Sequence, residues 1–185
     1  MTHLPDAALS AALIASIAGA LGVVTNGIWP LMRSRRRILA MQVLCSCLWA
    51  LHYLFLGAHT AAAMCMAGAA QGVVCTSLSR RWLRRTVYGA TIAFSLAITA
   101  ATWSGVPSAL AQSGQLMSAF GRLQPGQQAI RLAFLGSEAF WVTHNLLVGS
   151  HWGLTADAMA VTTLLIGLWR GWARPRPVLG RVATA

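Results

Sequence analysis

The sequence predicts an all-α integral membrane protein in which seven transmembrane helices form two parallel three-helix repeats joined by a linker helix. Three observations predict this class. Of the 185 residues, 57% are hydrophobic and only 9% are charged, whereas a soluble domain carries about 25% charged residues. The uncharged stretches are as long as membrane spans. One block of residues also recurs 92 positions further along the chain.

The charges are unequal, with 14 Lys+Arg against 3 Asp+Glu and a net charge of +11. A charge of this sign is also typical of nucleic-acid-binding proteins, whose basic residues spread over a soluble surface. Here every basic residue is an arginine, and the arginines form short clusters between long uncharged stretches. This pattern is typical of loops between membrane spans. We therefore expect a lipid bilayer around the chain and no nucleic-acid partner.

The predicted spans are bounded by arginine clusters and by short turns. The stretch 38–79 carries no acidic or basic residue other than histidine and is too long for one span, so we divide it at the turn 57–60. Pro107 follows the turn 104–106 and is well placed near a helix start. The seven predicted spans are 7–32, 38–57, 60–78, 86–103, 107–121, 129–149 and 152–170.

The arginines predict the topology, because basic residues favour the cytoplasmic side of a membrane. The connections after spans one, three and five contain Arg33–Arg37, Arg80–Arg85 and Arg122, and further arginines follow span seven. The connections 57–60, 104–107 and 149–151 contain none. We therefore expect a multi-pass protein of the bacterial inner (cytoplasmic) membrane, with its N-terminus outside and its C-terminus in the cytoplasm.

An internal repeat organises the chain. Trp49, His52, Leu54, Gly57 and His59 recur 92 residues later as Trp141, His144, Leu146, Gly149 and His151. This shift places spans one to three on spans five to seven, and span four has no counterpart. The two units are therefore predicted to be parallel, which is a known plan among transporters. The predicted divisions are a first repeat at 1–79, a linker helix at 80–104, a second repeat at 105–172 and a cytoplasmic tail at 173–185.

These residues carry a resemblance to known families. The 3-1-3 plan with an outside N-terminus resembles the SWEET/PQ-loop sugar-transporter fold. The segments 51–57 and 141–150 resemble the bacterial inner-membrane YgjV-type family, most strongly over 48–79 and 128–170. The resemblance implies a fold and a location more than an activity. The Pro-Gln dipeptide of PQ-loop proteins is absent from the ends of spans one and five.

Glu138 is the first candidate site residue, because it falls near the middle of span six. A charge at the bilayer centre costs about 2.5–3.5 kcal/mol on insertion scales. It is interpreted either as a proton or substrate group or as a protonated carboxyl hydrogen-bonded to a neighbouring helix. Trp141 and Asn145 share its helix face at spacings of three and seven. The face would suit a polyol, and it would equally suit helix packing.

Further candidates lie near the predicted outer boundary. Asp157 and His144 have similar depths on spans seven and six, so they could pair. Trp49 and His52 are the repeat counterparts of Trp141 and His144. The alternative interpretation is that these tryptophans and histidines are interfacial anchors.

Span five carries the last polar stripe. Ser108, Gln112 and Gln115 follow helical spacing and should face inward, because lipid penalises polar groups. They would either line a cavity or bond to other helices. Asn26 on span one is a similar candidate.

Two functions remain open. The first is a SWEET-like transporter or facilitator of a small polar solute. The second is a non-transporting membrane assembly or sensing protein on the same scaffold. An enzyme is not expected, because the chain has no HExxH motif, no Gly-rich phosphate loop and no metal-binding carboxylate cluster. We predict no catalytic residue, no metal and no cofactor. The partners expected are the bilayer and a small polar solute, and the composition is compatible with an oligomer.

Overall fold

A computed structural model describes residues 4–77 and 80–173, and these residues are helical without a β-strand. The described part contains seven α-helices and one short 3-10 helix. They are α1 (Leu4–Ile28), η1 (Trp29–Leu31), α2 (Arg35–Phe55), α3 (His59–Ser77), α4 (Arg81–Ala101), α5 (Val106–Leu123), α6 (Gln127–Val148) and α7 (His151–Trp172). The all-helical class is confirmed. The predicted cytoplasmic tail at 173–185 lies outside the described residues except for Ala173.

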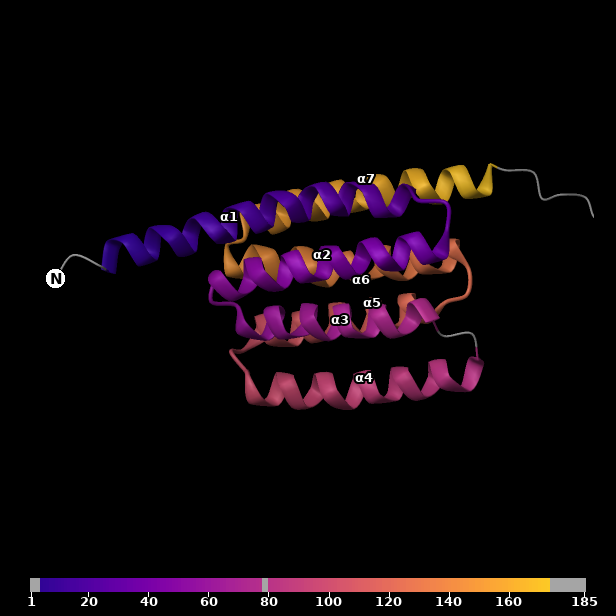
Figure 1. The fold of residues 1–185 in the computed structure, drawn as a ribbon, viewed down its shortest axis with the longest axis horizontal. Helices are drawn as coiled ribbons and strands as arrows, with labels where there is room; N and C mark the ends of the chain where they lie inside the picture. The colour runs from indigo at the N-terminus through magenta and orange to yellow at the C-terminus, as the bar shows by residue number, and fades with distance from the viewer. Residues whose placement is uncertain (1–3, 78–79, 174–185) are drawn as a thin grey trace, which may run out of the picture.

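The helices run side by side, with all their connections at two ends (Figure 1). α1, α2 and α3 form one layer in front of α7, α6 and α5, and α4 lies along one edge. Neighbouring helices pack in a closed order, α1–α2–α3–α5–α6–α7 and back to α1, while α4 packs against α3 and α5. The central helices α2 and α6 therefore face each other across the middle of the bundle.

The distribution of side chains is the reverse of that in a soluble protein. On α1, an exposed stripe at four-residue spacing consists of Leu9, Leu13, Ile17 and Leu21. Large apolar side chains are also exposed on each of the helices α2 to α7. Buried positions are often polar, among them Gln42, Gln71, Gln112, Gln115 and Asn145. A bundle with an apolar outside and a polar inside is stable in lipid.

Three helices are long and apolar enough to cross a membrane by length and composition alone: Leu9–Leu31, Arg35–Phe55 and His151–Trp172. The sequence predicted seven. The other α-helices in the described part do not meet this test of length and composition; among them, α5 carries Gln112 and Arg122, and α6 carries Glu138.

Glycine and proline residues in turns set the ends of α2 and α6 and the start of α5. Gly57 and Gly149 follow α2 and α6 with φ angles of 80° and 69°. This left-handed region is open to glycine at little cost. Pro107 occupies the first turn of α5, where its missing N–H would have no helical partner anyway. The turns at Gly57 and Gly149 and the start of α5 at Pro107 all lie where the sequence placed them.

One end of the bundle is held by two arginine guanidinium groups, one half-buried and one buried. Arg35, at the start of α2, donates to the carbonyl oxygens of Cys75, Arg122 and Gln124 at 2.9–3.1 Å. Arg131 on α6 donates to the carbonyl oxygens of Pro30 and Met32, both at 2.7 Å. These arginines therefore satisfy the free carbonyl groups at the ends of α3, α5 and η1.

Arg122 corrects one prediction. The sequence placed it in a polar loop at 121–128, but α5 continues to Leu123, and Arg122 is 4% exposed. The reason is that its side chain points between the helices, where Phe134 lies under the guanidinium with the ring centroid 5.3 Å from Cζ.

We predict that Arg35→Ala lowers the unfolding temperature in detergent micelles, because three helix-end carbonyl groups lose their charged donor. The loss should be about 2 kcal/mol or more, the range for hydrogen bonds to charged groups. Arg36→Ala is the matched control, since Arg36 is exposed on the same turn. Equal melting temperatures for the two variants would contradict this role of Arg35.

Candidate functional site

A cavity of about 80 Å³ lies between the two layers of helices. It has room for several water molecules, since one water needs roughly 10–15 Å³ measured in this way. Six helices contribute to it: α1, α2, α3, α5, α6 and α7. The polar or charged residues that line it are Asn26, Gln42, Ser46, Gln115, Ser118, Arg122, Ser137, Glu138 and Asp157, and the aromatic ones are Trp29, Trp49, Tyr53, Phe134 and Trp141.

Two carboxyl groups meet at one wall of the cavity. Glu138 on α6 is 7% exposed, Asp157 on α7 is 5% exposed, and the two side chains lie within hydrogen-bonding reach of each other. A hydrogen bond between two carboxyl groups requires a proton on one of them. The pair can therefore hold a proton or receive a hydrogen-bond donor.

Asn145 positions this acidic pair. Its Nδ2 donates to Asp157 Oδ2 at 2.8 Å, and its Oδ1 accepts from the Tyr53 hydroxyl at 2.7 Å. Gly153 makes room for this arrangement, because a Cβ at position 153 would overlap the Asn145 amide. The chain Tyr53–Asn145–Asp157 therefore connects α2, α6 and α7 beside the cavity.

The cavity is also rich in donors. Arg122 NH2 lies 3.5 Å from Ser46 Oγ, and Arg122 NH1 lies 3.5 Å from Gln71 Oε1. Both amide atoms of Gln42, Nε2 of Gln115 and Nε of Arg122 have no hydrogen-bond partner among the described residues, although all are buried. Buried polar groups are normally paired, and those that are not require an explanation.

The predicted tryptophans flank the cavity in equivalent ways. The indole of Trp49 packs against Gly22, and the indole of Trp141 packs against Gly114. The Tyr53 ring stacks on Trp141, with centroids 6.0 Å apart and an interplanar angle of 14°. The predicted membrane-boundary anchors are thus cavity walls in the structure.

The histidines lie outside the cavity. His52 Nδ1 is 2.8 Å from the Ala15 carbonyl oxygen, and His144 Nδ1 is 2.9 Å from the Pro107 carbonyl oxygen. His52 Nε2 also contacts Ser150 Oγ at 2.9 Å, whereas His144 Nε2 has no partner in the described part. Both histidines bind neighbouring helices.

The predicted pairing of His144 with Asp157 is wrong. The Asp157 carboxylate is bound by Asn145, and the His144 ring turns away toward the N-terminus of α5. Similar depth on adjacent helices does not place two side chains on facing sides, because one residue step rotates a side chain by about 100°.

The structure therefore divides the ten predicted residues. Glu138, Trp141, Asp157, Trp49, Gln115 and Asn26 line the cavity, and Asn145 supports it from behind. Gln112 faces α4 instead, where it accepts from Thr99 Oγ1 at 2.7 Å and donates to Ser95 Oγ at 3.0 Å. His52 and His144, the last two of the ten, lie outside the cavity and bond to neighbouring helices.

Gln42, Tyr53 and Arg122 are among the cavity residues that were not predicted. The sequence carried a signal for the first two, because Gln42 and Tyr53 share one helix face with the predicted Trp49. Arg122 had no such signal, since only the length of α5 shows that it belongs to a helix. Across the described residues, no group of three or more His, Cys, Asp or Glu could hold a metal ion.

Residues 11–175 match the model of a family named Imp-YgjV and described as bacterial inner membrane protein. Comparison with curated proteins found no match. Comparison with solved structures also found none.

We predict that Tyr53→Phe destabilises the bundle by about 1–2 kcal/mol, because Asn145 Oδ1 loses its donor in a buried position. Thermal unfolding in detergent, followed by circular dichroism, measures the effect. Tyr88→Phe is the control, since Tyr88 is half-buried on α4 and its ring packs on Phe120 outside the cavity. If both variants melt alike, the hydroxyl of Tyr53 does not hold the acidic pair in place.

Proposed function

This chain belongs to the Imp-YgjV family of bacterial inner-membrane proteins, and from that premise we propose that it is a SWEET-like facilitator of a small polar solute. The central cavity carries the proposal. It lies between α1–α3 and α5–α7, and its polar groups come from both sets of helices. A dry, apolar interface at this place would instead favour the non-transporting alternative.

A parallel duplication of α1–α3 and α5–α7 is part of the proposal. His52 bonds to the carbonyl of residue 15 and His144 to that of residue 107, so both partners shift by the same 92 positions. The Gly22–Trp49 and Gly114–Trp141 contacts shift in the same way. Tyr53 and Asn145, themselves 92 residues apart, contact each other. Equivalent residues meet in this way at a two-fold axis.

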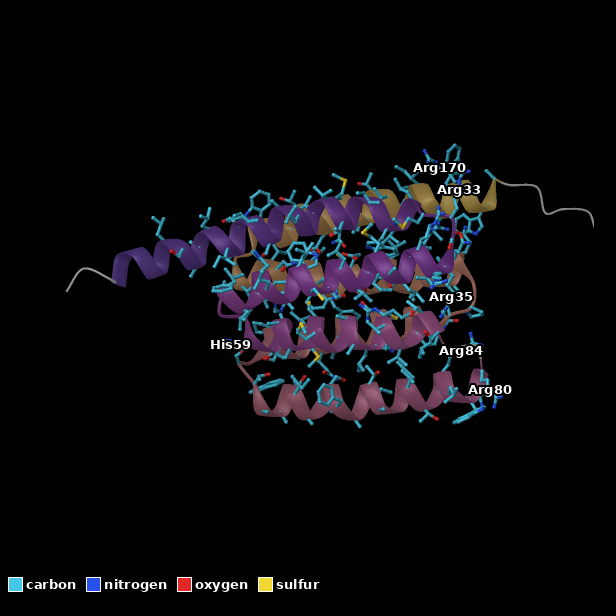
Figure 2. The ribbon with its side chains drawn as sticks, in the orientation of Figure 1. Arg33, Arg35, His59, Arg80, Arg84 and Arg170 are labelled. Carbon is cyan, nitrogen blue, oxygen red and sulfur yellow. The ribbon has the colours of Figure 1, made fainter. Side chains whose placement is uncertain are left out.

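Seven membrane spans complete the proposed architecture. Helices of 18 to 25 residues are roughly 27–37 Å long, close to the roughly 30 Å hydrocarbon core of a bilayer. The labelled Arg33, Arg35, Arg80, Arg84 and Arg170 all lie at one end of the bundle, and His59 lies at the other (Figure 2). The arginine end would face the cytoplasm.

Contacts between the two units at both ends of the cavity supply a basis for alternating access. At the arginine end, Arg35 and Arg131 each bond to the other unit. At the opposite end, His52 contacts Ser150 and Tyr53 contacts Asn145. Breaking one set while keeping the other would open the cavity to one side of the membrane.

We predict that proteoliposomes containing the protein exchange at least one radiolabelled small polar solute in a counterflow assay with glycerol, glucose and L-serine. Glu138→Gln should abolish the exchange, because the cavity loses its acidic pair. His59→Gln, at the exposed first residue of α3, is the control and should exchange at the unaltered rate. Exchange that is unaffected by Glu138→Gln, or absent for all three solutes, would contradict the proposed function.

A reporter fusion tests the proposed topology. Green fluorescent protein fused after residue 185 should fluoresce, and alkaline phosphatase fused at the same position should be inactive, because the C-terminus is cytoplasmic. Phosphatase fused after Ser104, in the turn between α4 and α5, should be active. The opposite pattern of activities would contradict the assigned orientation.

A further inference from the structure

The unpaired donors of the cavity are concentrated in one place. Gln42, Gln115 and Arg122 are 2–4% exposed, and all three line the cavity. Their partnerless groups are three N–H-bearing nitrogens and one amide oxygen. Leaving a buried donor unpaired costs about 1–3 kcal/mol. With Nε1 of Trp49, five buried partnerless atoms, four of them donors, belong to residues that line this one cavity. They indicate that a bound molecule supplies their partners, and that most of its contacts there are acceptors.

The Arg122 guanidinium lies at a depth similar to that of Glu138. It reaches from the last turn of α5 to Gly68 on α3, where a Cβ would lie 2.9 Å from Arg122 NH2. Gly68 is nine residues from the end of α3 at Ser77, or roughly 14 Å along the axis. Glu138 lies eleven residues into α6 from the same end, at roughly 16 Å. The Arg122 guanidinium and the Glu138 carboxyl group therefore lie at similar depths in the bundle.

The formal charges of the cavity balance. A guanidinium keeps its proton in proteins, so Arg122 contributes +1. Glu138 and Asp157 contribute −1 together when they share a proton. A solute with a net charge would upset this balance within the bilayer, at a high cost in free energy. A solute that carries both charges would not.

We infer that the cavity binds a small zwitterionic amino acid, with its carboxylate at Arg122, Gln115 and Gln42 and its ammonium group at Glu138 and Asp157. A carboxylate offers only acceptors, which fits the unpaired donors, and an ammonium group offers only donors, which fits the acidic pair. The cavity volume limits the side chain to a few atoms. The inference names the solute class of the proposed facilitator and rests on that function for transport, but binding can be measured without it.

Four ligands of nearly the same size separate the contributions: L-serine, L-serinamide, L-glycerate and glycerol. Serinamide lacks the carboxylate, glycerate lacks the ammonium group, and glycerol lacks both. The purified protein in detergent micelles is titrated with each ligand by isothermal calorimetry and by thermal unfolding. L-serine should bind and raise the unfolding temperature. Each of the others should bind roughly tenfold more weakly or worse, since one charged hydrogen-bonded group is lost.

Two variants locate the site. Arg122→Gln should weaken L-serine binding and reduce the preference for serine over serinamide. Glu138→Gln should reduce the preference for serine over glycerate. Arg36→Gln, which makes the first change at an exposed position outside the cavity, should bind serine as the unaltered protein does. If Arg122→Gln does not fold, the four-ligand series on the unaltered protein decides the question.

The outcomes distinguish the two proposals. If glycerol binds as tightly as serine, or if serine does not bind, the zwitterion assignment is overturned. Counterflow of glycerol or glucose would still leave the proposed facilitator intact. Serine binding without counterflow of any solute would overturn the facilitator and retain the binding site.

Discussion

A polar side chain on a membrane helix has to face another part of the protein, because lipid offers it no hydrogen bond. This constraint explains the arrangement of the bundle more completely than its apolar packing does. Gln112 connects α5 to the hydroxyl face of α4. Arg35 connects α2 to the ends of α3 and α5. Asn145 connects α6 to α2 and α7. Each of these contacts fixes the rotation of a helix that apolar side chains alone would leave undetermined.

The same constraint gives the cavity its significance. Elsewhere in the described bundle, buried polar groups are mostly paired with protein atoms. Apart from His144 Nε2, the unpaired atoms belong to cavity residues, namely Gln42, Trp49, Gln115 and Arg122. Water can fill such a space, and a solute with matching groups can displace it when it reproduces the lost hydrogen bonds. A site with fixed, unpaired donors and a pair of carboxyl groups is therefore preorganised for a dipolar molecule.

The sequence predicts helix positions better than helix rotations. Long uncharged stretches and arginine clusters located all seven helices, because the length of a span and the positions of its charges are local properties. The 92-residue spacing of the predicted repeat drew attention to Trp49 and Trp141, and both line the cavity. The failures concern which way a side chain points. His144 and Asp157 share a depth but not a face, and Arg122 turns inward because α5 extends past the predicted end at Gly121. Rotation depends on contacts between distant segments, which no local pattern contains.

Comparison of positions 92 residues apart shows where the two halves differ. Glu138, Asp157 and Arg122 correspond to Ser46, Cys65 and Pro30, so every charged residue of the cavity belongs to the second half. The first half contributes the neutral groups Gln42, Ser46 and Tyr53 to the same space. The contacts that shape the walls are retained in both halves, as His52 and His144 show. A symmetric cavity would place like charges opposite each other, and their mutual repulsion within the membrane would be costly. Confining both signs of charge to one half removes that repulsion and leaves the other half as a neutral wall, so recognition of the proposed solute would depend mainly on α5–α7.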